Sequence, residues 1–202
     1  MKIFCIGRNY QEHINELNNE TPVSPVVFMK PKSAIARKGF PIPYPTFTED
    51  LQYEAEVVIQ IKKNGKKIEV ASAHEYYDTW TLGIDFTARD IQNKLKSKGL
   101  PWELAKSFDN SAVVGEFMPI NNRIQNTAFK LLINDDAVQE GNTKDMIFSI
   151  DRIISYISQY FSIQMGDLIF TGTPAGVGSI LPFDEVKGYL DGKEVFNTII
   201  KE

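Results

Sequence analysis

The stretch YEAEVVIQIK, residues 53–62, predicts a β-strand, because it is rich in Val and Ile and an apolar residue recurs at every second position. The same stretch carries two glutamates, Glu54 and Glu56, set two residues apart. Side chains at positions i and i+2 of a strand point to one face of a sheet, so the two carboxylates lie near each other. On the solvated face of an edge strand, water and salt screen their repulsion. In a cavity, a divalent cation or a raised pKa must compensate for it.

Further strands and turns are predicted on both sides of this stretch. Short apolar runs predict strands at residues 3–6, 26–29, 79–86 and 167–170. Turn-forming residues predict three hairpins: Asn64-Gly65 joins residues 53–62 to 66–70, Asn134-Asp135-Asp136 joins 129–133 to 137–140, and Asp191-Gly192 lies within 189–200.

Helices are expected to be few. Residues 10–17 and 88–98 favour helices, and a longer helix is predicted to begin at Ser149. In this last segment an apolar stripe with the i, i+3, i+4, i+7 spacing is formed by Ile150, Ile153, Ile154, Ile157 and Phe161. Because strands and helices do not alternate regularly, the sequence predicts a β-rich α+β protein and not a doubly wound parallel sheet.

The composition is that of an ordinary globular protein. The 202 residues suit one domain, residues 1–202, with a full apolar core. A formal net charge of −4 and a pI near 5.3 oppose a nucleic-acid surface, so a small-molecule partner is expected. No apolar run approaches the roughly 20 residues of a membrane span, and residues 1–10 lack the features of a signal or transit peptide. With Cys5 as the single cysteine, a cytoplasmic location is expected.

A third carboxylate lies near the end of the predicted strand at residues 79–86. Together with Glu54 and Glu56, Asp85 would form an all-oxygen site drawn from two strands. Such a site suits Mg²⁺, Mn²⁺ or Ca²⁺ and not zinc, since Cys and His are absent from the neighbouring sequence. The alternative role for Asp85 is the N-cap of the helix that follows.

The segment YQEHINELN, residues 10–18, combines a histidine and a glutamate at helical spacing. His13 and Glu16 are three residues apart, so the carboxylate can accept a hydrogen bond from one imidazole nitrogen and leave the other nitrogen as a base. That arrangement is half of a water-activating site. The alternative is an exposed histidine on a polar helix. A structural role is expected for His74, the other histidine.

Two further features indicate an anionic ligand. Lys106 has apolar neighbours, and a buried ammonium needs an anionic partner, such as a carboxylate cluster or an enolate. The loop TGTPAGVG, residues 171–178, lacks the spacing of a P-loop or a dinucleotide site, so a nucleotide is not expected. Its backbone N–H groups and the Thr173 hydroxyl can hold a substrate carboxylate; the alternative is a simple turn.

Six motifs occur in order along the chain: IGRNYQEHINEL, FMKP, YEAEV, GIDFTARDIQ, GLPWELAKSFD and TGTPAGVG. Together they resemble the fumarylacetoacetate hydrolase family, specifically its short single-domain acylpyruvase and oxaloacetate decarboxylase branch. The resemblance covers nearly the whole chain. It implies a mixed β fold of rolled, barrel-like sheets that holds Mg²⁺ or Mn²⁺ and is usually a homodimer.

The resemblance also implies roles for individual residues. The family's metal carboxylates are matched by Glu54, Glu56 and Asp85. Its catalytic residues are matched by His13, Glu16 and Lys106. Positions expected to bind substrate are Arg8, Lys30, Gln92 and Thr173.

The implied reaction is hydrolysis of the C3–C4 bond of an acylpyruvate, a 2,4-dioxo acid, to pyruvate and a carboxylic acid. His13, oriented by Glu16, would activate the attacking water. Decarboxylation of oxaloacetate gives the same enolate without water, so one site can perform both reactions. Two alternatives stay open. One is an isomerase, decarboxylase or hydratase that acts on the 2-oxo acids of aromatic catabolism. The other is a carboxylate-binding or scaffolding module without activity.

Overall fold

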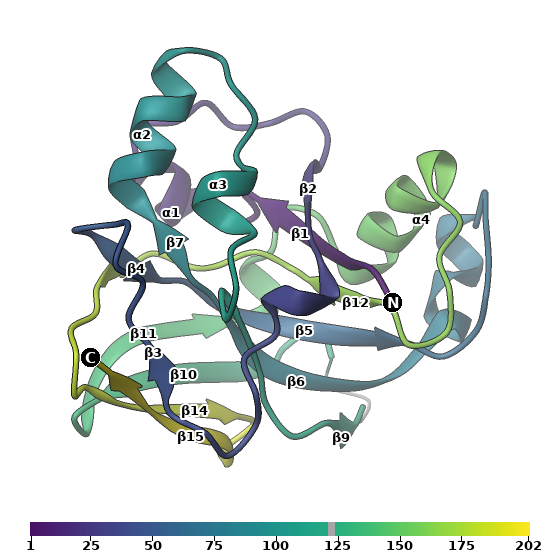
Figure 1. Cartoon of the computed structure of the whole chain (residues 1–202). Coiled ribbons are helices and arrows are strands. Elements are labelled where there is room, and N and C mark those ends of the chain that lie inside the picture. The colour runs from purple at the N-terminus through teal and green to yellow at the C-terminus, as the bar shows by residue number, and fades with distance from the viewer. Residues whose placement is uncertain (121–123) are drawn as a thin grey trace.

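The computed structural model of the chain describes residues 1–120 and 124–202 (Figure 1). Its largest sheet has the spatial order β2 (Val26–Lys30), β1 (Ile3–Gly7), β12 (Leu168–Phe170), β5 (Ala55–Ile61), β6 (Tyr77–Asp85) and β8 (Ala112–Val114), with β9 (Met118–Pro119) also paired to β6. A second sheet has the order β11 (Asp136–Asn142), β10 (Ala128–Ile133), β14 (Glu185–Leu190), β15 (Lys193–Lys201) and β3 (Ile42–Pro43). A short third sheet contains β13 (Gly178–Ser179), β4 (Leu51–Tyr53) and β7 (Thr87–Ala88).

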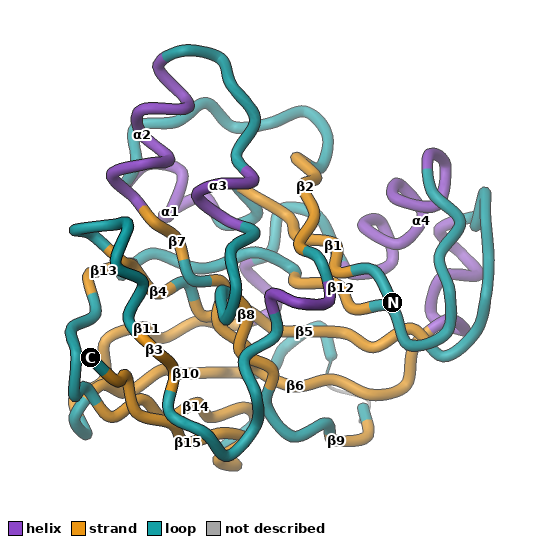
Figure 2. The backbone as a smooth tube through the Cα atoms, in the orientation of Figure 1, coloured by secondary structure: helices purple, strands orange, loops and turns teal. Residues whose placement is uncertain are grey.

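The sheets are mixed and curl around one another. β1 runs parallel to β12 and β15 runs parallel to β3, whereas the other named pairs are antiparallel. Figure 2 shows the strands as a curled, half-barrel layer, with α1 (Gln11–Glu16), α2 (Arg89–Ser97) and α3 (Glu103–Lys106) above one end and α4 (Ile150–Tyr160) beside the other. Single 3₁₀ segments occupy Lys32–Ala34, Val70–Tyr76 and Thr143–Asp145. The predicted β-rich α+β fold of rolled, barrel-like sheets is confirmed.

β5 is a central strand, which explains why its sequence is apolar on both faces. Val57 and Ile59 belong to the largest core cluster, which they share with α4. Val58 points to the opposite face and packs with Cys5 and Phe170. Because β5 lies between β12 and β6 and both carboxylates are buried, the interpretation of Glu54 and Glu56 as the solvated face of an edge strand is wrong.

Two of the three predicted hairpins are confirmed. Asn134-Asp135 joins β10 to β11, and Asp191-Gly192 joins β14 to β15. All four turn residues have positive φ, between 51° and 76°. A two-residue type I′ turn requires this conformation at both central positions, and Asn, Asp and Gly adopt it most readily. β11 begins at Asp136, one residue earlier than the sequence predicts.

The hairpin predicted at Asn64-Gly65 is wrong. Residues 66–70 do not form a strand, and β5 pairs instead with β6, which begins at Tyr77. The backbone of Gly65 exchanges hydrogen bonds of 3.0 and 2.9 Å with Ile163, and the Ile68 N–H donates to Ser158 Oγ at 2.8 Å. The segment after β5 is therefore bonded to the last turn of α4 and to the residues just beyond it, a contact distant in sequence that no local turn signal reveals.

α4 confirms the predicted long helix. The Ser149 side chain caps it by accepting a hydrogen bond from the Arg152 N–H. The predicted stripe is buried at Ile150, Ile153, Ile154 and Ile157. Phe161 departs from the prediction, because the helix ends at Tyr160 and the Phe161 ring is 39% exposed while it packs on Phe4. No helix among the described residues has the length and apolar character needed to cross a membrane.

Candidate active site

Three buried carboxylates meet where β5 begins and β6 ends. Glu54 precedes β5, Glu56 is its second residue, and Asp85 is the last residue of β6. The Asp85 N–H donates to the Glu54 carbonyl at 2.8 Å, which fixes the two chain segments side by side. One oxygen from each carboxylate lies within 4.8 Å of the others, and the three residues are at most 6% exposed. An all-oxygen set of this kind fits a hard divalent cation such as Mg²⁺ or Mn²⁺.

Glu54 reaches this position because the predicted strand of residues 53–62 is broken there. β4 ends at Tyr53 in the short sheet, and β5 begins at Ala55 in the large one. The Ala55 N–H donates to the Gln139 side-chain oxygen at 2.9 Å and not to a neighbouring strand. The chain changes sheets at Glu54, so the carboxylate points into the space where the two sheets meet.

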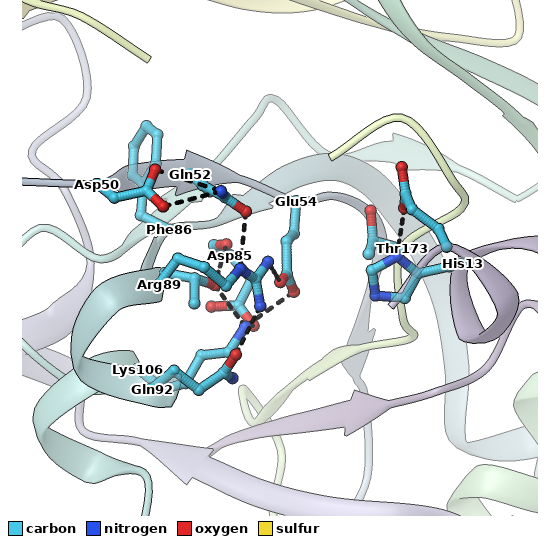
Figure 3. Close-up of polar contacts among 12 residues, drawn as sticks. His13, Asp50, Gln52, Glu54, Asp85, Phe86, Arg89, Gln92, Lys106 and Thr173 are labelled. Carbon is cyan, nitrogen blue, oxygen red and sulfur yellow. Dashed lines mark hydrogen bonds and ion pairs between the residues drawn. The ribbon is translucent and has the colours of Figure 1, made fainter. Parts of the chain in front are cut away.

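Lys106, on α3, holds two of the carboxylates together (Figure 3). Its Nζ lies 2.8 Å from Glu54 Oε2 and 2.8 Å from Asp85 Oδ2, and it donates to Thr87 Oγ1 at 2.6 Å. Burial by itself lowers the pKa of Lys106, but Asp85 and Glu54 raise it above its usual value. The ammonium is therefore buried with anionic partners, as the sequence predicts.

Two further buried cations complete the charged cluster. Arg89, at the start of α2, places one guanidinium nitrogen 2.5 Å from Glu54 Oε1 and donates from another to Gln92 Oε1 at 2.6 Å. Lys30, at the end of β2, places its Nζ 2.8 Å from Asp85 Oδ1. Burial raises the pKa of Glu54, whereas Lys106 and Arg89 together hold it well below its usual value.

Glu56 is the carboxylate without such a partner. Its Oε2 accepts a hydrogen bond of 2.7 Å from the Gly172 N–H, and no cation of the described residues forms an ion pair with it. Burial, Asp85 and Glu54 all raise the pKa of Glu56 well above its usual value. A divalent cation among these three residues would remove the repulsion that raises this pKa, so the donor set and its charge both fit a metal.

His13 lies on the other side of the same pocket (Figure 3). His13 Nδ1 is 3.1 Å from Glu16 Oε2, and His13 is only 6% exposed, so the alternative of a solvated histidine is wrong. The second oxygen of Glu16 accepts from the Gly176 N–H at 3.0 Å, within the loop of residues 171–178. This bond holds the carboxylate, and the carboxylate orients the imidazole ring.

The structure brings most of the predicted site residues to one pocket. Predicted residues that line it are Arg8, His13, Glu54, Glu56, Gln92, Lys106 and Thr173. Asp85 and Glu16 contact this group through Lys106 and His13. Lys30 lies behind Asp85, where it also bonds to Ser111 Oγ at 3.0 Å, so its expected contact with substrate stays a prediction.

Three residues outside the predicted set shape the site. Arg89 is a cation in the first turn of a helix, where the helix dipole disfavours positive charge, and this misplaced charge is a signal in the sequence. Gln139 on β11 donates to Thr173 Oγ1 at 3.0 Å while it holds Ala55. Asn9 bonds to the backbone of Phe148 and of Thr171. Gln139 and Asn9 act through contacts distant in sequence, and no local pattern marks them.

Comparison with known proteins gives concordant results. The family model for the fumarylacetoacetate (FAA) hydrolase C-terminal region matches residues 2–199. A mitochondrial oxaloacetate tautomerase of Mus musculus is 43% identical over 192 residues, which cover 94% of this chain and 87% of the relative. A mitochondrial oxaloacetate decarboxylase of Dictyostelium discoideum is 37% identical over 207 residues, which cover 100% and 95%.

A solved structure agrees with these sequence matches. The fumarylpyruvate hydrolase from Pseudomonas aeruginosa, in complex with Mn²⁺ and pyruvate, superposes with a TM-score of 0.94 at 32% identity, covering 100% of this chain and 89% of that chain. The motifs, the buried carboxylate centre and the matched length of sequence lead to one assignment. The chain belongs to the fumarylacetoacetate hydrolase family, a family of enzymes.

Proposed function

We propose that the protein is a Mg²⁺- or Mn²⁺-dependent enzyme that converts 2-oxo acids through an enolate, with oxaloacetate as its first candidate substrate. The observation that carries the proposal is one pocket that contains a buried three-carboxylate centre, the Lys106 ammonium and an oriented His13. The names of the matched relatives, an oxaloacetate tautomerase and an oxaloacetate decarboxylase, support the choice of substrate.

The metal would be held by Glu54, Glu56 and Asp85, and when bound it would supply Lewis-acid polarisation of the 2-oxo group. Lys106 lies against two of these carboxylates, so its positive charge stabilises an oxyanion that develops beside them. Thr173, held by Gln139, presents its hydroxyl to the pocket and can donate to a substrate carboxylate. These contacts bind and orient the substrate.

His13 is the proton-transfer group of the proposed site. With Nδ1 directed to Glu16, its Nε2 remains available to the pocket as a base. In tautomerisation or decarboxylation of oxaloacetate, this nitrogen would carry the proton that leaves or returns to C3. In both reactions the negative charge develops on the 2-oxo oxygen, near Lys106.

Hydrolysis of acylpyruvates is the second candidate, and the oriented His13 favours it. Here the imidazole would take a proton from water, the resulting hydroxide would attack the C4 carbonyl, and the C3–C4 bond would break to give a carboxylic acid and the enolate of pyruvate. The structural match to a fumarylpyruvate hydrolase supports this reaction. Breaking the C–C bond by decarboxylation requires no water, so the two activities depend on His13 to different degrees.

The test is a kinetic panel on chelator-treated protein resupplied with Mg²⁺ or Mn²⁺. Oxaloacetate, acetylpyruvate and fumarylpyruvate are followed by ultraviolet loss of the enol and by nuclear magnetic resonance of the products. We expect metal-dependent turnover of at least one substrate. Absence of turnover on all three with either metal would contradict the proposal.

The His13→Gln variant separates the two candidate reactions. We expect hydrolysis of an acylpyruvate to fall at least about 100-fold, because general-base catalysis contributes that much or more. Decarboxylation of oxaloacetate should retain a larger fraction of its wild-type rate. Glu12→Gln on the same helix is the control, because Glu12 is exposed and does not line the pocket. Equal losses of both activities would overturn the role of His13 as the base that activates water.

We infer that the protein forms a homodimer through the groove between β2 and α3. Apolar residues that line the groove are Met29, Phe47, Leu104 and Phe108. Leu104 is 71% exposed and Phe47 is 51% exposed. Contiguous exposed apolar surface of this kind marks an interaction site. Sedimentation equilibrium tests the inference: Leu104→Glu should shift the protein towards monomer, and a monomeric wild type would contradict it.

A further inference from the structure

Two cations line the pocket without a carboxylate partner. Lys96 lies in the last turn of α2, and Arg8 lies in the turn between β1 and α1. Lys96 is exposed, and its Nζ donates to Asn19 Oδ1 at 3.2 Å. Within residues 1–120 and 124–202, no Asp or Glu forms an ion pair with Lys96 or Arg8. The mouth of the pocket is therefore positively charged and open to an anion.

The positive groups repel one another. Partial loss of hydration lowers the pKa of Lys96, and the guanidinium groups of Arg8 and Arg89 lower it further. Arg89 has Glu54 as its partner, whereas Lys96 has an amide oxygen and Arg8 has no carboxylate. An anionic group placed between Lys96 and Arg8 would relieve this repulsion.

Arg8 is held in place by its backbone. Its φ of 60° lies in the left-handed region, which residues with a Cβ rarely adopt. The next residue, Asn9, keeps the turn in this conformation through side-chain hydrogen bonds of 2.7 to 3.1 Å to the backbone of Phe148 and Thr171. The turn thus presents Arg8 to the pocket from a fixed position.

The charges deeper in the pocket cancel. Three buried carboxylates, Glu54, Glu56 and Asp85, are matched by three buried cations, which are Lys30, Arg89 and Lys106. A divalent cation added to this neutral cluster leaves two positive charges, and Lys96 and Arg8 add two more, so a dicarboxylate substrate offsets more of the positive charge than a monocarboxylate does. The net charge of the metal-loaded cluster and the positive charges of Lys96 and Arg8 therefore both favour binding of a dianion.

We propose that Lys96 and Arg8 bind the distal carboxylate of a dicarboxylic 2-oxo acid. The inference rests on the proposed function, which places the first carboxylate and the 2-oxo group at the three-carboxylate centre. Lys96 and Arg8 are specificity residues in this scheme, because they contact the end of the substrate that distinguishes dicarboxylic from monocarboxylic 2-oxo acids. A monocarboxylic acid would leave both cations without a partner.

Binding of two unreactive acids tests the proposal. 2-Oxoglutarate and 2-oxopentanoate have the same chain length and differ in the distal carboxylate, and titration calorimetry gives their Kd values on Mg²⁺-loaded protein. We expect wild type to bind 2-oxoglutarate about tenfold more tightly, the effect of one charge-assisted contact near a surface. Lys96→Met should bring the ratio of Kd values close to one, and Lys96→Arg should restore most of it.

The control is Lys98→Met, which removes the same charge two residues away at a position that does not line the pocket. It should keep the wild-type ratio, and thermal melts establish that all variants are folded. A Lys96→Met ratio equal to that of wild type would overturn the proposal, as would failure of both acids to bind. The calorimetric test does not depend on turnover, because neither acid reacts. Absence of turnover on every substrate would therefore refute the proposed function, while the ratio of the two Kd values would still test the binding of the distal carboxylate.

The KM and kcat of the Lys96 and Lys98 variants for oxaloacetate give a second test, provided that the wild-type protein turns over this substrate. Lys96→Met should raise the KM for oxaloacetate about tenfold and change kcat much less, because the contact is made in both the ground state and the transition state. A loss confined to kcat would place Lys96 in the chemical step and contradict a role in binding the distal carboxylate.

Discussion

The two ends of the β5 and β6 pair differ in what they contribute to the protein. Towards α4, Ile59 and Trp80 belong to a cluster of buried apolar side chains. At the opposite end, Glu56 and Asp85 of the same two strands lie in a cluster of buried charges. The first end stabilises the fold by about 1.5 to 3 kcal/mol for each large side chain it buries. The second gathers like charges, which oppose folding until cations compensate for them.

This contrast means that stability and activity respond to different substitutions in one pair of strands. Changes at the charged end should affect metal binding and turnover while the apo protein stays folded. Changes at the α4 end should affect the free energy of unfolding while the folded enzyme keeps its kinetic constants. Substitutions at Glu56 and Ile154 test the contrast, and a change in both stability and turnover in either variant would break it.

Glu56→Gln should have the largest effect. It keeps the shape of the side chain but removes a metal ligand, so we expect kcat/KM to fall about 10³-fold, since metal polarisation supplies several kcal/mol to a transition state. Titration calorimetry should show lost metal affinity. Because burial and two neighbouring carboxylates oppose the charge on Glu56, chemical denaturation of the apo variant should show no loss of stability. A destabilised apo variant would contradict the separation of roles.

Ile154→Ala tests the other end of the strands. Ile154 is fully buried on α4, and its truncation leaves a cavity, so the free energy of unfolding should fall by about 3 kcal/mol. Urea denaturation measures the change. Ile154→Val is the graded control and should cost about 1 kcal/mol. We expect kcat/KM of the folded variant to stay within a factor of two of wild type, and a loss as large as that of Glu56→Gln would break the comparison.

Gln139→Leu should affect both properties, because Gln139 links the two sheets at the site. It leaves the buried Ala55 N–H without its acceptor, which costs about 2 kcal/mol of stability. It also releases Thr173, so metal or substrate affinity should fall about tenfold. Gln139→Glu keeps the acceptor for Ala55 but loses the donor to Thr173 and to the Pro174 carbonyl. If that variant recovers stability but not affinity, the bond to Ala55 accounts for the stability and the bonds to Thr173 and Pro174 account for the affinity.

Ser149→Ala should have the smallest effect. The hydroxyl accepts a hydrogen bond from the Arg152 N–H at the start of α4, and loss of such a cap costs about 1 kcal/mol. The melting temperature measures this change, and kcat/KM should not move. Ser149→Asp should restore stability, since aspartate caps helices as well as serine does. An effect on turnover from either variant would show that α4 is coupled to the site.

The comparison also explains which parts of the structure could be predicted from the sequence. The carboxylate centre is predictable because Glu54 and Glu56 lie two residues apart at the start of a strand and Asp85 lies at the end of another, although the break in the chain at Glu54 is not part of that local pattern. The turns at residues 134–135 and 191–192 were equally local, since their residue types tolerate positive φ. The stripe on α4 follows from helical spacing alone.

The remaining features depend on partners that are distant in sequence. The strand break at Glu54 requires Gln139, and the failed hairpin at Gly65 results from pairing with Ile163. Arg89 and Lys96 lie at opposite ends of one helix, and only the folded chain brings both of them to the pocket. Local patterns thus identify the chemical groups, and tertiary contacts decide how they are arranged.

The position of β1 has a consequence for how the protein is made. Ile3 on β1 pairs with Leu168 on β12, so the central sheet stays open until late in synthesis. Until β12 arrives, β1 presents an apolar edge that can join to another chain. Pairings so distant in sequence also slow folding, because a long loop must close before they form. We therefore expect slow refolding, on the millisecond to second scale, and a nascent chain prone to aggregation until Phe170 has left the ribosome.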